Sequence, residues 1–348
     1  CYFKPESGLN PEAVERYEAN ILGCTRQFRY STANTNTIDM VLSVNGIPVV
    51  ALELKNQLTG KDCACAMNQY KSDRSSKEFA FRLNHRFLVY FAVDLYEVWM
   101  TTRLEDGNTR FMPFNQGSNG AGVSGGAGNP ANPNGYVTSY LWEEVLQRDS
   151  LLDLIQRFIS NVKEKETEEK NGVVKTITKE KMLFPRYHQY DVVRKVLADV
   201  KQNGPGKNYL IQHSAGSGKS NSIAWTTYRL ASLFNTENKP VFASVIVVTD
   251  RTVLDAQLQE TISGFDHTLG AVEAIGEDKN SGDLRDAINN GARIIITTLQ
   301  KFPVIYQEVD KVAGRNFAII VDEAHSSQTG SSALKLKAAL ADTEDALR

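Results

Sequence analysis

Apolar and polar residues alternate on both sides of the dipeptide Asn45-Gly46, which predicts two antiparallel strands joined as a hairpin. The even positions are apolar on either side of the turn: Ile38, Met40, Leu42, Val44, Val50, Leu52 and Leu54. The odd positions include Asp39, Glu53 and Lys55. Side chains alternate between the two faces of a strand, so we expect the even face in the core and the three charged residues together on the other face.

The register of this hairpin decides whether the two carboxylates meet. A two-residue loop would place Asp39 opposite Leu52 and mix the faces. A three-residue loop over 44–46, with Gly46 in the left-handed conformation, pairs Ser43 with Ile47 and makes Glu53 a diagonal neighbour of Asp39 at about 7–8 Å. We therefore predict the three-residue register, with positive φ at Gly46 as the last residue of the loop or as the site of a bulge. That separation lets both carboxylates hold one divalent metal, with Lys55 beside it.

The second half of the chain has a different pattern, in which short apolar runs alternate with helical stretches. Four runs rich in β-branched residues are predicted as strands, at 209–211, 243–249, 293–297 and 317–321. Nearly continuous apolar strands separated by helices are typical of a parallel sheet covered on both faces. The predicted fold class is α/β, with a mixed first domain followed by a doubly wound parallel-sheet lobe.

Composition divides the chain further. Residues 115–135 are mostly Gly, Asn and Pro, which predicts a long surface loop within the first domain. The charged run 163–170 is interpreted as a linker or an exposed helix end. We therefore expect domains at 1–160 and 183–348, with a charged linker at 161–182.

Overall composition excludes some classes of protein and gives little positive evidence. A net charge of −2 provides no basic footprint, so any contact with nucleic acid must come from local patches. No apolar run approaches the roughly 18 residues that span a bilayer. The four cysteines are interpreted as reduced thiols of a cytoplasmic protein: Cys1, Cys24, Cys63 and Cys65. A chain that opens at Cys1, without Met, can have lost its natural N-terminus.

A phosphate-binding loop is the strongest single motif. The segment 213–220, His-Ser-Ala-Gly-Ser-Gly-Lys-Ser, lies between the predicted strand at 209–211 and a helical stretch. Backbone N–H groups around Gly216 and Gly218 would surround the phosphates of ATP. Lys219 would reach the β- and γ-phosphates, and the Ser220 hydroxyl would bind Mg²⁺.

A second acidic motif follows about a hundred residues later. Asp322, Glu323, Ala324 and His325 directly follow the apolar strand 317–321. At the end of a strand beside a phosphate loop, Asp322 would help to bind Mg²⁺ and Glu323 would activate the attacking water.

These two motifs together resemble the superfamily 2 helicases and translocases of the DEAH-box kind. The resemblance implies that Gln189, in the segment 184–189, reads the adenine base and that His325 belongs to the ATP site. It also implies that two loops at strand ends contact nucleic acid, one through Thr249 and Arg251 and the other through Thr298 and Lys301. Motors of this family use a second lobe, so we expect the chain to be a fragment that turns over little ATP alone.

The first domain resembles the PD-(D/E)xK nucleases, with Asp39, Glu53 and Lys55 as the catalytic set. The segment 38–56 and the His that opens the phosphate loop further resemble the restriction (R) subunit of type I restriction–modification enzymes, and this resemblance covers essentially the whole chain. One departure concerns a glutamine–tyrosine pair that these nucleases often carry at a three-residue gap. Gln69 and Tyr70 are adjacent here, so Gln69 is the least supported candidate.

The resemblance implies ATP-dependent translocation on double-stranded DNA coupled to metal-dependent cleavage, with ATP and Mg²⁺ as cofactors. It implies three partners: DNA, a specificity subunit and a modification subunit that methylates adenine. The main alternative is a DEAH-type helicase or remodeller whose N-terminal domain only binds a partner, in which case the charged trio is a structural ion cluster. A type III restriction subunit fits less well, because its nuclease follows the motor. A nucleotide-binding module without turnover also remains open for the chain as it stands.

Overall fold

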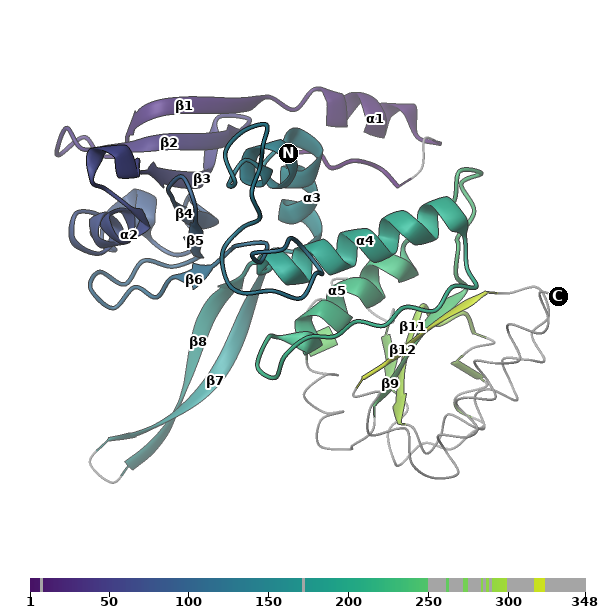
Figure 1. The fold of residues 1–348 in the computed structure, drawn as a ribbon. Coiled ribbons are helices and arrows are strands. Elements are labelled where there is room, and N and C mark those ends of the chain that lie inside the picture. The colour runs from purple at the N-terminus through teal and green to yellow at the C-terminus, as the bar shows by residue number, and fades with distance from the viewer. Residues whose placement is uncertain are drawn as a thin grey trace. The chain divides into compact units, whose positions relative to one another are not determined.

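The computed structural model describes residues 1–6, 9–170, 173–249, 261–262, 272–274, 283, 286–287, 290–298 and 316–322 (Figure 1). The chain divides into two units, Cys1–Asp191 and Val192–Arg348. The last residue of the first unit lies inside the helix α4 (Tyr187–Asn203). Within the described ranges, no helix is both long and apolar enough to cross a lipid bilayer.

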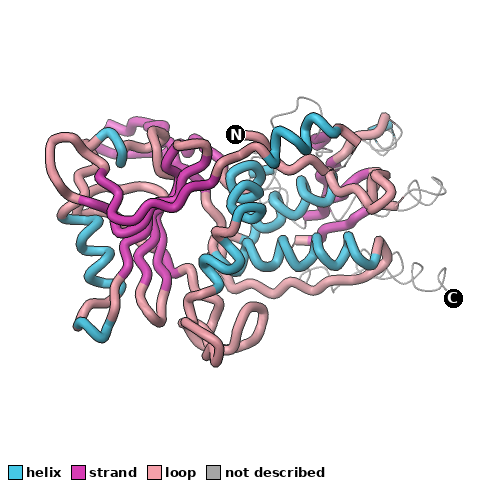
Figure 2. The backbone as a smooth tube through the Cα atoms, turned by 90° about the horizontal axis from the view of Figure 1, so that it is seen from above, coloured by secondary structure: helices cyan, strands magenta, loops and turns pink. Residues whose placement is uncertain are grey.

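A six-stranded mixed sheet forms the centre of the first unit. Its strands lie in chain order: β1 (Leu22–Arg29), β2 (Thr37–Val44), β3 (Ile47–Leu54), β4 (Val89–Val93), β5 (Val98–Thr101) and β6 (Met112–Pro113). Only β3 and β4 pair in parallel, and the other neighbours are antiparallel. Figure 2 shows the twist of the sheet, which is the usual consequence of right-handed strand twist.

The crossover from β3 to β4 carries the helix α2 (Cys63–Ser72), which packs on one face of the sheet. Asp62 caps this helix by accepting a hydrogen bond from the Cys65 N–H, as is usual for aspartate at an N-cap. Two short 3₁₀ turns flank α2, η1 (Gln57–Thr59) and η2 (Phe79–Phe81). Tyr70 of α2 is fully buried in a cluster that includes Val41 and Ala51 of the strands beneath it.

The remaining helices of the first unit lie near its N-terminus. The helix α1 (Pro11–Glu18) begins with the Asn10 cap and a proline, both favourable at a helix start. The π-helical turn η3 (Leu141–Val145) precedes α3 (Arg148–Arg157). Tyr17 of α1 hydrogen-bonds Asp149 of α3, which joins the two helices.

The hairpin differs from the prediction in its loop. Val44 pairs with Ile47 across a two-residue turn in which Asn45 (φ 51°) and Gly46 (φ 80°) both have positive φ. The predicted three-residue loop is therefore wrong, although the positive φ of Gly46 is confirmed. Positive φ at both central residues is the requirement of a type I′ turn, whose twist matches that of the flanking strands.

A β-bulge then corrects the register. Ser43 pairs with Pro48 but Leu42 pairs with Val50, so one residue of β3 has no partner in the ladder. Beyond the bulge Met40 pairs with Leu52, and the next step of this register places Asp39 opposite Glu53. The bulge, rather than the loop, thus brings the two carboxylates to the same face.

The predicted core face is only partly correct. Four of the seven even-numbered apolar residues are buried: Ile38, Val44, Val50 and Leu52. Met40 and Leu42 are only half-buried, and Leu54 is 39% exposed, so the prediction fails there. Val41 and Ala51 on the odd face are also buried, because α2 covers that face. Both faces of the hairpin are therefore part of the protein interior near its centre.

Residues 115–135 contain only turns and irregular backbone, as predicted for a surface loop. The charged segment that follows α3 is not the exposed helix end that was one of its two interpretations. It forms a two-stranded antiparallel ribbon, β7 (Ser160–Lys170) and β8 (Val173–Leu183) (Figure 1). The register places Ser160 opposite Leu183 and Lys163 opposite Glu180, so at the second of these pairs the residues have opposite charges.

The second unit contains a parallel sheet in the order β10 (Val272–Ala274), β11 (Ile294–Thr298), β9 (Ser244–Thr249) and β12 (Phe317–Val321). The helix α5 (Lys219–Ala231) packs against three of these strands. The α/β fold class is confirmed, and so are the strands predicted at 243–249, 293–297 and 317–321. The strand predicted at 209–211 is wrong: this segment is irregular and Leu210 is 89% exposed.

Candidate functional site

Three charged side chains predicted to share a face meet at the bulged hairpin. Asp39 extends from β2, Glu53 from β3, and Lys55 lies just beyond β3, where its N–H donates to the carbonyl of Val93. The Lys55 Nζ is 3.3 Å from Oδ2 of Asp39 and 3.8 Å from Oε2 of Glu53. The ammonium group therefore lies between the two carboxylates.

Burial differs sharply among these three residues. The Glu53 side chain is 0% exposed, Lys55 is 12% exposed and Asp39 is 27% exposed. The trio thus forms a site that opens to solvent on the Asp39 side and is closed at Glu53. Charges in such a place interact strongly, because water screens them poorly.

The same environment shifts the pKa values of Glu53 and Asp39 in opposite directions. Burial raises the pKa of Glu53 to about 7, and the charge of Asp39 adds to this rise while Arg74 opposes it. Burial also raises the pKa of Asp39, but the hydrogen bond from the Leu54 N–H and the charge of Lys55 outweigh it, so the net pKa lies below its ordinary value. Two acids with separated pKa values are typical of a functional carboxylate pair.

The buried arginine Arg74 is a component that the sequence analysis does not predict. It lies just after α2, and its Nη2 donates to Oε1 of Glu53 at 2.8 Å and to the carbonyl of Thr37 at 2.7 Å. The spacing of 21 residues from Glu53 corresponds to no helical or strand period. Only the fold of the crossover could have revealed it.

Two further residues border the site. The side chain of Gln27 in β1 donates a hydrogen bond to Oδ1 of Asp39 at 3.2 Å. The backbone of Gln27 has φ 51°, which is uncommon for residues other than glycine. Gln69, the least supported candidate, is half-buried on α2 beside Tyr70. Burial raises the pKa of Tyr70, and the charge of Glu53 adds to the rise.

The carboxylate pair fits a divalent cation in its donor chemistry. Hard cations such as Mg²⁺ take oxygen ligands, and Oε2 of Glu53 is a buried oxygen without a hydrogen-bond partner in the described structure. Asp39 supplies the second carboxylate on the solvent side. In the described ranges no group of three or more His, Cys, Asp and Glu side chains is arranged to hold a metal, so the pair would need water or substrate oxygens as further ligands.

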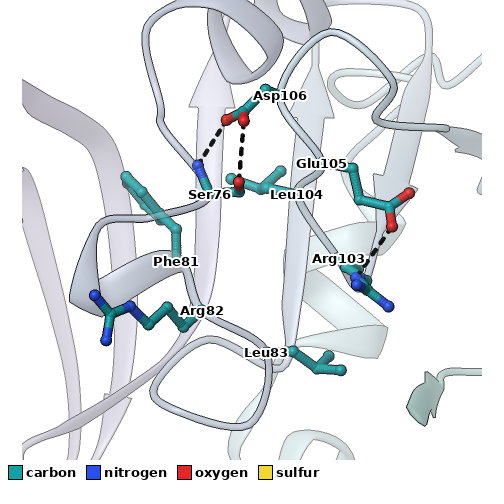
Figure 3. A pocket seen from close by; sticks show the side chains of 8 residues that line it. All are labelled: Ser76, Phe81, Arg82, Leu83, Arg103, Leu104, Glu105 and Asp106. Atoms are coloured by element: carbon teal, nitrogen blue, oxygen red, sulfur yellow. Dashed lines mark hydrogen bonds and ion pairs between the residues drawn. The ribbon is translucent and has the colours of Figure 1, made fainter. Parts of the chain in front are cut away.

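A separate pocket of about 360 Å³ lies between the segments 76–83 and 103–106 (Figure 3). Asp106 accepts hydrogen bonds from the Ser76 N–H and hydroxyl, which join the two segments. Arg103 and Glu105 pair at 3.2 Å on its wall. Its lining contains none of the residues predicted for catalysis, so the hairpin remains the candidate site of this unit.

The second unit contains the predicted phosphate loop in irregular backbone followed by α5. Gly216 (φ 70°) and Gly218 (φ 82°) both have positive φ, which glycine adopts without strain, and Gly218 is the N-cap of α5. Lys219 and Ser220 are the first two residues of that helix. Burial lowers the pKa of His213, and the charge of Lys219 lowers it further, so the two side chains are close.

The strand ends of the parallel sheet carry further candidates. Thr249 ends β9 and pairs with Thr298, which ends β11. Asp322 directly follows β12, and its N–H donates to the carbonyl of Val248 in β9. Adjacent parallel strands thus bring these three residues to the same edge of the sheet. Four other predicted residues lie outside the described residues: Arg251, Lys301, Glu323 and His325.

Gln189, the candidate for adenine recognition, lies in the first turn of α4 and is buried. Its Oε1 accepts a hydrogen bond from the Arg186 N–H at 2.9 Å. The neighbouring aromatic residues pack within the first unit: Tyr187 contacts the rings of Phe114 and Tyr140. The predicted ATP-site segment 184–189 is therefore held by the first unit in this structure.

Comparison with known proteins gives each unit a counterpart. Residues 11–109 match the family model described as type I restriction enzyme R protein N terminus, and residues 188–345 match the SWI2/SNF2 ATPase model. The first match contains all of the hairpin site and Arg74. The second match contains the phosphate loop and the strand-end residues.

Curated relatives agree with this assignment. The chain is 27% identical over 307 residues to the type I restriction enzyme HindI endonuclease subunit of Haemophilus influenzae, which covers 84% of this chain and 26% of that protein. It is 24% identical over 341 residues to the putative type I restriction enzyme MjaVIIIP endonuclease subunit of Methanocaldococcus jannaschii, covering 90% of this chain and 30% of that protein. The chain thus spans less than a third of these relatives. Over most of its length the chain is therefore similar to type I restriction enzyme endonuclease subunits.

Proposed function

We propose that this protein is the part of a restriction subunit that couples ATP-dependent translocation on double-stranded DNA to metal-dependent cleavage of that DNA. The observation that carries the proposal is the meeting of Asp39, Glu53 and Lys55 at one site in the domain that matches the R-protein family. The phosphate loop and the strand-end residues of the ATPase domain support the translocation part.

In the nuclease domain, Asp39 and Glu53 would hold Mg²⁺. The metal, when bound, would supply electrostatic stabilisation of the phosphate and an activated water. Lys55 stands between the carboxylates, so its ammonium group can neutralise charge that develops on a scissile phosphate. The solvent-accessible Asp39 side gives the DNA backbone a route to these groups.

In the ATPase domain, Lys219 would contact the β- and γ-phosphates, and Ser220 with Asp322 would hold Mg²⁺. Glu323 would orient the attacking water, while Gln189 and His325 would contribute to nucleotide binding. Thr249, Arg251, Thr298 and Lys301 would contact DNA phosphates, which position the duplex without reading its sequence. Such contacts suit a motor that moves along DNA of any sequence.

The proposed partners are double-stranded DNA and the specificity and modification subunits of a type I restriction complex. The roles proposed for the site residues are phosphate and metal binding, so sequence recognition is assigned to the specificity subunit. The complex would act in the cytoplasm of a bacterium or archaeon, where DNA and ATP are available.

The nuclease assignment is tested by nicking of supercoiled DNA with the 348-residue chain in Mg²⁺ or Mn²⁺. Nicking by the wild type should fall by at least about 100-fold in Asp39→Ala and in Glu53→Ala, because each change removes a ligand or a charge that acts on the reacting phosphate. Glu105→Ala is the matched control, since this carboxylate is exposed and pairs only with Arg103 in the described contacts. Equal nicking by all four proteins would favour a helicase-like protein whose N-terminal domain only binds a partner.

A further inference from the structure

Arg74 and Glu53 form an ion pair that is almost completely shielded from solvent. The Arg74 side chain is 3% exposed and the Glu53 side chain 0% exposed. Two guanidinium nitrogens, Nε at 3.2 Å and Nη2 at 2.8 Å, donate to the same carboxylate oxygen, Oε1 of Glu53. Burying two charges is costly unless their geometry is good, and removing one partner of such a pair is costlier still.

The same guanidinium joins three elements of the fold. Its Nη2 also donates to the carbonyl of Thr37, the first residue of β2 and two residues before Asp39. Its carbon lies 5.2 Å from the ring centre of Tyr30, which covers it in a cation–π contact. Arg74 therefore fixes the end of α2 to both of the strands that carry the acids.

The two oxygens of Glu53 are consequently not equivalent. Oε1 accepts both bonds from Arg74, whereas Oε2 is buried without a hydrogen-bond partner among the described residues. The nearest cation that the structure gives to Oε2 is Lys55, at 3.8 Å, which is an ion pair rather than a hydrogen bond. Oε2 is thus the oxygen left for another ligand.

We propose that Arg74 is a positioning residue of the nuclease site: it occupies Oε1 of Glu53 so that Oε2 is presented to the divalent metal, and it holds the Asp39 strand at the same time through Thr37. The proposal rests on the nuclease function proposed above. Outer partners of metal ligands act in this way in metalloenzymes generally, and their loss costs about 10–100-fold in metal affinity or activity.

The chemistry of arginine is required for this arrangement. A planar guanidinium presents several N–H groups in a fixed geometry, and can bond a carboxylate and a main-chain carbonyl together. A lysine at position 74 would keep the positive charge but would offer one nitrogen. Charge alone and geometry can therefore be separated by substitution.

The test is the binding of Mn²⁺ to the 348-residue chain without nucleotide. Binding is measured as the loss of the electron paramagnetic resonance signal of free Mn²⁺. The binding that the wild type shows and Glu53→Gln lacks defines the nuclease site. Arg74→Met and Arg74→Lys should both fold, as judged by circular dichroism. Arg74→Met should bind this Mn²⁺ about 10–100-fold more weakly than the wild type, and Arg74→Lys should bind it several-fold more weakly. Arg82→Met is the matched control, because Arg82 is exposed and donates to the Lys77 carbonyl instead.

The outcomes separate the two proposals. Wild-type Mn²⁺ affinity in a folded Arg74 variant would overturn the positioning role while leaving the nuclease function in place. Arg74→Lys keeps a positive charge beside Glu53, so it can test the positioning role even if Arg74→Met does not fold. Identical Mn²⁺ binding by the wild type and Glu53→Gln would overturn the metal site itself, and with it both proposals.

Discussion

At the scale of single residues, Glu53 is an acid in an unusual position. Burial removes its hydration, Asp39 repels its negative charge, and Arg74 with Lys55 attracts it. The net effect is a pKa of about 7, above the ordinary 4.5. The folded state therefore binds a proton at Glu53 at pH values where the unfolded chain has released it.

This shift predicts how the stability of the metal-free protein depends on pH. The pKa of Glu53 is higher in the folded state than in the unfolded chain, so protonation of Glu53 stabilises the fold. This contribution is complete below about pH 4.5 and is lost as the pH rises to about 7. Glu53→Gln lacks the titrating group, so its free energy of unfolding should increase relative to the wild type across this window by up to about 3 kcal/mol. Urea denaturation at several pH values in chelator measures the difference. Parallel curves for the two proteins would show that Glu53 does not titrate there.

Residue patterns predict the trio of the candidate site but not the residue that supports it. Asp39, Glu53 and Lys55 occupy odd positions along the hairpin, so the alternation predicts one shared face, and the bulge in β3 keeps the two carboxylates on that face. Arg74 reaches them from the far side of a helical crossover, and nothing in local spacing indicates that contact. Residues that act across sequence-distant elements require the fold.

At the scale of elements, the hairpin shows where local rules succeed and where they fail. Asn45-Gly46 correctly predicts a tight turn, and the alternation correctly predicts the strands. The bulge was missed, although Pro48 was a usable signal: proline cannot donate to a ladder and occurs in sheets at edges and bulges. A one-residue bulge shifts every later pairing of the two strands by one residue, as a loop one residue longer would do. The shared face of Asp39 and Glu53 is therefore predicted correctly from the wrong loop.

The turn gives a test of its own conformation. A Cβ added at Gly46 would meet no atom within 4 Å, so only the positive φ opposes a side chain there. Gly46→Ala should therefore destabilise the protein by about 1–2 kcal/mol, the cost of the left-handed region for an alanine. Chemical denaturation measures this, with Gly107→Ala as the control, since Gly107 has equal space but no positive φ. Equal stabilities of the two variants would contradict the type I′ turn.

The elements outside the hairpin also divide into those that the sequence pattern predicts and those that it does not. The strands at 243–249, 293–297 and 317–321 are predictable because each is an apolar, β-branched run, which is typical of strands in a parallel sheet. The segment 209–211 has the same composition but is too short to be distinguished from an exposed loop. The ribbon β7–β8 does not follow from the sequence pattern, because a run of charged residues predicts solvation rather than strand pairing.

At the scale of the whole molecule, the two proposed activities belong to different units, so they should be separable by mutation. Lys219 begins α5 in the second unit, at the phosphate loop rather than in a hydrophobic core. In the assembled restriction complex, Lys219→Ala should reduce ATP-driven translocation by about 10²–10³-fold and abolish the cleavage that depends on it. Displacement of a triplex-forming oligonucleotide measures the movement.

Asp39→Ala is the complementary variant for that experiment. It should translocate normally in the same complex and fail to cut, because its carboxylate lies in the first unit. A Lys219→Ala complex that still moves along DNA would contradict the assignment of the phosphate loop. Loss of translocation in Asp39→Ala would contradict the independence of the two sites.

The six-stranded sheet also has two outer edges, and their design bears on how the protein behaves when concentrated. An open edge strand can pair with the edge of another molecule and start aggregation. β1 interrupts such pairing with the left-handed backbone of Gln27 between the cations Arg26 and Arg29, and β6 is only two residues long and ends in Pro113. Gln27 thus serves two purposes, since the kink that blunts the edge also turns its amide toward Asp39. The backbone of the outer strand β1 and the geometry of the proposed nuclease site are therefore linked through one residue.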